Sequence, residues 1–156
     1  MNKKRNYLQK ETNQPMTQTP FQHAFNGSFV ALLSWTDFEQ CWQRLRQTEA
    51  SWYIYQPAKD LPRSTTSGDK LRQQLDQIEQ YLLQEHRHDY CGIVYVDNPQ
   101  QPSFIKIYDP TNLGVVCGIS QGKPLPGWVL STMAPETLNT RPTVSRKRSW
   151  WQHLFS

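Results

Sequence analysis

The sequence predicts an α+β fold, a two-layer sandwich in which a mostly antiparallel sheet of about five strands carries two helices on one face. The apolar segments follow the order strand, helix, strand, helix and then three strands in succession. Short, turn-rich links separate the last strands, as is typical of antiparallel neighbours. A length of 156 residues is that of one domain with a sizeable core.

The first part of the domain contains two strands and a helix. The apolar run Phe29–Leu33 predicts the first strand. Thr36 is followed three residues later by Glu39, a pair typical of a capping box, and helical spacing of apolar residues predicts a helix over Asp37–Gln47. Trp52–Tyr55 is expected to be a short aromatic strand.

The longest helix is predicted to open at Ser67 and to end between Glu85 and His88. Its apolar side chains recur at spacings of three and four, so they lie on one face. These side chains are Leu71, Leu75, Ile78, Tyr81 and Leu82.

The stretch from Asp89 to Ser120 predicts a three-strand meander around which the domain is organised. Cys91–Val96 is apolar almost throughout, which favours a central strand. After a six-residue polar loop, Phe104–Tyr108 alternates, with Lys106 facing away from its two isoleucine neighbours. A third strand is predicted to start at Val115–Cys117, and Trp128–Leu130 is expected to be a short strand or turn.

Charge and polarity divide the chain into three parts. Residues 1–21 are polar, with a net charge of +3, and are expected to be a disordered N-terminal arm. Residues 22–138 form the predicted α+β globular domain, with nine basic and twelve acidic side chains. Residues 139–156 carry +4 and are expected to be a flexible basic linker ending in an aromatic docking peptide. Affinity for a polyanion is therefore expected in the tails rather than in the body.

The chain is expected to be cytoplasmic. It contains no apolar run of about 18 residues, so no transmembrane helix is predicted. No apolar segment follows the charged N-terminus, so no signal peptide is predicted. The odd number of cysteines, Cys41, Cys91 and Cys117, favours reduced thiols.

The densest group of potential metal ligands lies after the long helix. His86, His88 and Cys91, with Cys117 brought close by the meander, have the nitrogen and sulfur atoms that zinc prefers. The two cysteines could also hold a nucleophile or a redox pair. The spacing matches no standard zinc motif, so we expect no cofactor and keep a small metal- or thiol-dependent enzyme as an alternative function.

Asp97 and Asp109 come before and after the predicted strand Phe104–Tyr108 of the hairpin, and they could serve as an acid–base pair. Both occur in turns rich in proline and asparagine, where aspartate is typical because it binds backbone N–H groups. The structural interpretation is therefore preferred. The chain has no glycine-rich phosphate loop with an adjoining lysine and hydroxyl residue.

The C-terminus provides the main functional signal. On a helix, four large side chains, Trp150, Trp151, Leu154 and Phe155, share one face, next to Arg146, Lys147 and Arg148. Such a segment is typical of a peptide that anchors in a groove on a protein partner. Folding back onto its own domain, binding an anionic membrane and binding nucleic acid remain alternatives.

Two resemblances accompany these patterns. Gln152-His153-Leu154-Phe155 loosely resembles the peptide by which bacterial replication and repair proteins dock on the sliding clamp, although it is one residue shorter between Gln152 and Leu154. The span 85–131 also resembles a small, functionally uncharacterised family of proteobacterial proteins, which implies a bacterial cytosolic origin and adds no activity. The matching segments are Asp89–Asp97, Lys106–Pro110, Asn112–Gly114, Cys117–Gly118 and Leu125–Ser131.

The sequence thus predicts a non-enzymatic adaptor. Its partner-binding residues are expected to be Trp150, Trp151, Gln152, Leu154 and Phe155. The sliding clamp is one candidate partner, by the resemblance above.

Overall fold

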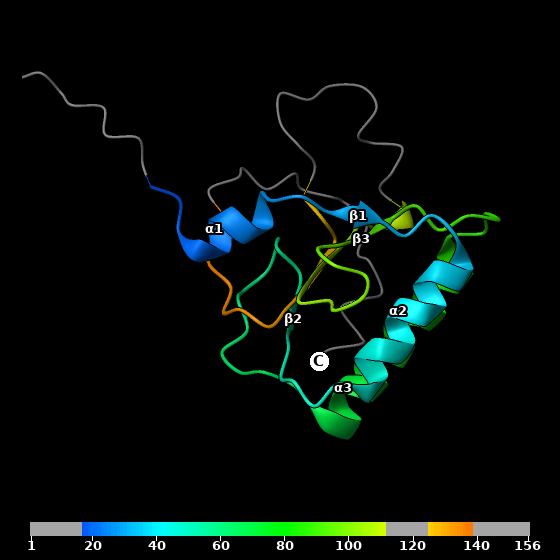
Figure 1. Ribbon diagram of the computed structural model, residues 1–156, viewed down its shortest axis with the longest axis horizontal. Coiled ribbons are helices and arrows are strands. Elements are labelled where there is room, and N and C mark those ends of the chain that lie inside the picture. Colours follow the sequence, from blue (N-terminus) through cyan, green and yellow to red (C-terminus); the bar gives the residue numbers. More distant parts are fainter. Residues whose placement is uncertain (1–16, 112–124, 139–156) are drawn as a thin grey trace, which may run out of the picture.

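A computed structural model describes residues 17–111 and 125–138 of the protein (Figure 1). The described residues form one five-stranded sheet in the order β1-β3-β4-β5-β2, and every pair of neighbours is antiparallel. The predicted α+β class is confirmed. The elements are α1 (Pro20–Phe25), β1 (Val30–Ala31), α2 (Trp35–Gln47), β2 (Tyr53–Tyr55), α3 (Gly68–Glu85), β3 (Val94–Val96), β4 (Phe104–Ile107) and β5 (Trp128–Ser131).

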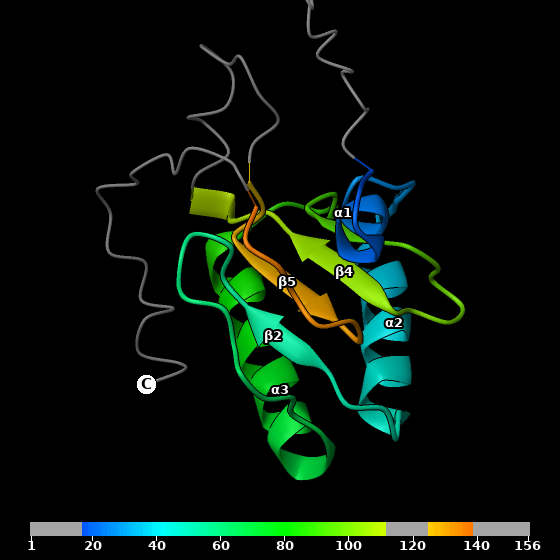
Figure 2. The ribbon, with the colours of Figure 1, turned by 90° about the vertical axis from the view of Figure 1, so that its left-hand side faces the viewer.

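Helices α2 and α3 lie together on one face of the sheet, as predicted (Figure 2). Both place an apolar stripe against the sheet, so that Trp42 and Leu75 are fully buried. The Trp42 indole nitrogen donates to the Leu75 carbonyl oxygen at 3.0 Å, which ties the two helices together. Ile105 and Leu130 project from the middle strands into this core.

The short helix α1 lies on the opposite side of the sheet, where no helix was predicted (Figure 1). Phe21 is only 1 % exposed, and its ring packs 5.5 Å from that of Phe104. The N-terminal arm was predicted to extend to residue 21, whereas Pro20 and Phe21 belong to α1. The difference arises because Phe21 is buried by residues far along the chain, together with the capping box of Thr19 and Gln22.

The predicted capping box of α2 has the wrong register. The helix begins at Trp35, and the box joins Ser34 to Asp37 rather than Thr36 to Glu39. Asp37 N–H donates to Ser34 Oγ at 3.0 Å, and Ser34 N–H donates to Asp37 Oδ2 at 3.3 Å. Ser34 is extended and paired with Tyr90, so the helix starts as soon as this pairing ends.

The strands also differ in detail from the sequence prediction. β3 starts at Val94 rather than Cys91, because Gly92 has φ +69° and turns the backbone out of the extended conformation. The described neighbours of β4 are β3 and β5, whereas the strand predicted at Val115–Cys117 lies outside the described residues. Among the helices of the described ranges, none has the length and apolar character needed to cross a bilayer.

Candidate functional site

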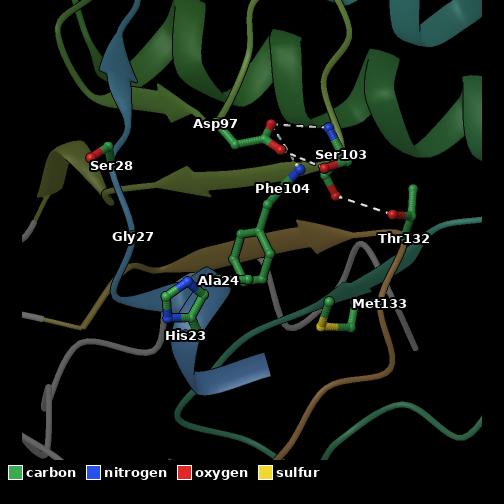
Figure 3. Close-up of a pocket in the computed structure, with 9 residues that line it drawn as sticks. All are labelled: His23, Ala24, Gly27, Ser28, Asp97, Ser103, Phe104, Thr132 and Met133. Atoms are coloured by element: carbon green, nitrogen blue, oxygen red, sulfur yellow. Dashed lines mark hydrogen bonds between the residues drawn. The ribbon is translucent and has the colours of Figure 1, made fainter. Parts of the chain in front are cut away.

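A hollow of about 250 Å³ opens between α1, the β3–β4 hairpin and the segment after β5 (Figure 3). Phe104, which is 3 % exposed, contributes an apolar wall, while hydroxyl groups and an imidazole lie around it. The hollow is smaller than the roughly 300–1,000 Å³ that is typical of small-molecule sites. The lining residues are His23, Ala24, Gly27, Ser28, Asp97, Ser103, Phe104, Thr132 and Met133.

Asp97 lines the hollow and closes the β3–β4 hairpin. Its Oδ1 accepts hydrogen bonds from the backbone N–H groups of Ser103 at 3.0 Å and Phe104 at 3.1 Å. Its Oδ2 accepts one from the Ser103 hydroxyl. Figure 3 shows the His23 ring on the α1 side of the hollow, across from this carboxylate. Asp97 therefore has the turn-stabilising role that the sequence favoured.

Asp109 lies beyond the other end of β4, so the structure does not bring it together with Asp97. It is 7 % exposed and accepts hydrogen bonds at Oδ1 from the Tyr81 phenol and the Thr111 hydroxyl, both at 2.8 Å. The Thr111 backbone N–H donates to the same oxygen at 2.9 Å. This network satisfies a buried carboxylate, as burial of such a group requires. The hypothesis of an Asp97–Asp109 acid–base pair is therefore wrong.

Two of the predicted metal ligands, His86 and His88, lie side by side after the C-terminal end of α3, and Cys91 joins them through its backbone oxygen rather than its thiol. The buried His86 lies with Nε2 2.7 Å from the Cys91 carbonyl oxygen. The ring centroids of His86 and the exposed His88 are 4.8 Å apart. His88 stacks on Tyr90 at 5.4 Å, and the Trp35 indole nitrogen donates to the His88 carbonyl oxygen at 2.8 Å. We call these five residues the histidine corner.

The cysteines of the described ranges have the properties of core side chains. Cys41 and Cys91 have no exposed surface. Burial raises the pKa of the Cys41 thiol to about 11 and also raises the pKa of Cys91. A reactive thiol requires the opposite, an accessible site that lowers the pKa. Cys117 lies outside the described residues.

Within residues 17–111 and 125–138, no three histidine, cysteine, aspartate or glutamate side chains are grouped so as to hold a metal ion. Of the four predicted zinc ligands, the described ranges therefore bring together only the side chains of His86 and His88. The predicted partner-binding residues 150–152, 154 and 155 and the predicted polyanion-binding residues 146–148 lie outside the described residues.

Sequence reasoning missed the exposed apolar side chains around β1, an edge strand of the described sheet. Val30 is 50 % exposed and Leu33 is 66 % exposed. Tyr90 is 59 % exposed, and its backbone pairs with that of Ser34, which follows Leu33. An edge position was not visible in the sequence, because it depends on which strands pair.

No protein-family model, curated protein or solved structure matches this chain. The resemblances of residues 85–131 and 152–155 stay predictions.

Proposed function

We propose that the protein is a non-enzymatic adaptor that docks on a protein partner through its C-terminal peptide, with Trp150, Trp151, Gln152, Leu154 and Phe155 as contacts. The observation that carries the proposal is that residues of the described ranges supply a packed core on both faces of the sheet. A fold with its own core does not require these terminal aromatic side chains for burial. Large apolar side chains that a fold does not need are typical of interaction segments.

The two core clusters support this division of roles. On the helical face, Trp42, Trp52 and Trp128 are 0 %, 1 % and 2 % exposed and contribute the largest apolar surfaces. On the other face, Phe21, Tyr55 and Phe104 pack together, with Leu138 against them. Leu138, the last residue of the second described range, thus packs against this second cluster. In the sequence, eleven residues lie between Leu138 and Trp150.

The roles of the chemically active side chains also favour an adaptor over a thiol enzyme. The thiols of Cys41 and Cys91 are buried, and the Asp97 and Asp109 carboxylates are held by neighbouring donors. Each of these groups stabilises the fold in a way that physical chemistry explains without a substrate. The alternative in which the basic tails bind nucleic acid or a membrane is separated from the proposal by the experiment that follows.

The experiment compares three full-length proteins immobilised through the N-terminus. One is the wild type, one carries Trp150→Ala and Trp151→Ala, and one carries Arg146→Gln, Lys147→Gln and Arg148→Gln. Each is probed with purified bacterial sliding clamp, with host lysate proteins identified by mass spectrometry, and with duplex DNA and anionic lipid vesicles.

We expect a protein partner that binds the wild type and the charge variant but does not bind the tryptophan variant. Binding to DNA or vesicles that the charge variant loses, and that falls steeply with salt, would replace the proposal with the polyanion alternative. Protein partners that are identical for the wild type and the tryptophan variant would refute the adaptor.

A further inference from the structure

The hydrogen bond of His86 fixes which of its ring nitrogens carries the proton. A carbonyl oxygen can only accept, so Nε2, 2.7 Å from the Cys91 oxygen, is the donor. In the neutral ring, Nδ1 then holds the lone pair. A histidine that binds a metal ion through one nitrogen and donates its other N–H to a backbone carbonyl is the common arrangement at metal sites. His86 therefore has the tautomer that leaves Nδ1 able to bind a metal ion.

His88 lies at the distance that a second ligand would occupy. A metal ion about 2.0 Å from each of two imidazole nitrogens, with an angle of roughly 90–110° at the metal, places the ring centroids about 4.5–5.2 Å apart. The observed separation of the His86 and His88 centroids is 4.8 Å.

The rest of the histidine corner restrains His88. The Trp35 indole holds the His88 carbonyl at 2.8 Å, and the Tyr90 ring stacks on the imidazole with an angle of 25° between the planes. His86 is anchored more firmly, since it is 4 % exposed and ends α3 as its C-cap. Ligands held by their surroundings lose less conformational freedom on binding than mobile ones do.

We propose that His86 and His88 form a two-histidine site for a borderline divalent transition metal ion, namely Zn²⁺, Ni²⁺ or Cu²⁺. Neutral imidazole suits these ions, whereas Mg²⁺ and Ca²⁺ prefer several oxygen ligands. Because no third protein ligand from the described residues joins the pair, water completes the coordination. The exposed His88 gives the ion access from solvent. The site is independent of the proposed adaptor function.

The test is a calorimetric titration of the full-length protein with ZnCl₂ and with NiCl₂, and with MgCl₂ for comparison. The wild type is expected to bind one transition metal ion per chain and no Mg²⁺. His88→Asn is expected to weaken binding at least about tenfold, since even the loss of an outer-shell partner costs about 10–100-fold at known sites. His23→Asn and His153→Asn are the matched controls, and both are expected to bind as the wild type does.

Proton NMR of the imidazole groups provides a second readout that does not depend on affinity. On addition of Zn²⁺, the signals of His86 and His88 are expected to shift together, while the His23 signal stays in place. His86→Asn is the less suitable variant, because its loss also removes a buried hydrogen bond of the fold. Absence of saturable binding by the wild type would overturn the proposal, as would equal affinity of His88→Asn.

Discussion

The Tyr81 phenol donates a hydrogen bond of 2.8 Å to the Asp109 carboxylate, which joins α3 to the chain just beyond β4. Both side chains are buried, with 1 % and 7 % of their surface exposed. Gly127 packs against the same residue, since a Cβ at position 127 would lie 3.1 Å from the Asp109 Cβ. The contact therefore joins the long helix to the chain at the neighbouring ends of β4 and β5.

The first prediction follows from this contact. Tyr81→Phe leaves the buried Asp109 carboxylate without one of its donors, so we expect the free energy of unfolding to fall by about 1–3 kcal/mol. Urea denaturation followed by tryptophan fluorescence measures the change. Tyr90→Phe is the control, because Tyr90 is 59 % exposed, and it should change stability by less than about 0.5 kcal/mol. Equal effects of the two substitutions would contradict the buried network.

The second prediction tests the start of α2. Ser34→Ala removes the side chain that caps the helix, so it should cost about 1 kcal/mol of stability. Thr36→Ala, at the position that the sequence favoured as the cap, should be close to neutral because Thr36 is an exposed residue inside the helix. Thermal unfolding by circular dichroism compares the two variants. A larger loss for Thr36→Ala would place the cap where the sequence predicted it.

The third prediction concerns α1. Phe21→Ala removes a ring that is 1 % exposed and packs against Phe104, and we expect a loss of about 3–5 kcal/mol. The control His23→Ala changes an exposed residue of the same helix and should have little effect. Chemical denaturation of both variants gives the comparison. If Phe21→Ala unfolds at the wild-type urea concentration, α1 does not belong to the folded domain.

The fourth prediction concerns pH and the Cys41 thiol. Burial raises its pKa from 9.0 to about 11, with smaller contributions from Arg44, which lowers it, and Asp97, which raises it. The neutral thiol is therefore favoured in the folded state. The stability that this preference contributes is complete below pH 9 and is lost as pH rises towards 11.

The burial of the thiols is measured with a thiol-reactive dye. The protein carries Cys117→Ser, so that only the two buried cysteines, Cys41 and Cys91, can react. At pH 8 the thiols of the native protein should react slowly with the dye. After unfolding in urea, both thiols should react rapidly. Rapid native reaction of either thiol at pH 8 would show that it is accessible.

The spacing of apolar residues along the chain was sufficient to predict helices α2 and α3. In α3, Leu71, Leu75 and Ile78 recur at the spacing of one helical face, and the structure buries all three. Phe104–Ile107 likewise alternates as predicted, with Ile105 and Ile107 in the helical-face core and Lys106 on the other side with Phe25 and Phe29. These predictions succeeded because the side-chain period depends on neighbouring residues alone.

The histidine corner could be predicted in part. The sequence grouped His86, His88 and Cys91 because they are adjacent along the chain. It could not show that His86 would bind the backbone oxygen of Cys91 rather than share a ligand set with its thiol. The contribution of Trp35 was missed altogether, because it reaches His88 from more than fifty residues earlier in the chain.

The sequence by itself determined the class of the fold, the order of its main elements and the separation of an acidic body from basic ends. Tertiary structure decided which residues meet: that Phe21 belongs to the core, that Asp97 and Asp109 lie apart, and that the rings of His86 and His88 lie 4.8 Å from each other. The physical reason is that periodicity and charge are local properties of the chain. Burial and hydrogen bonding depend on contacts between distant segments, and these exist only once the strands have paired.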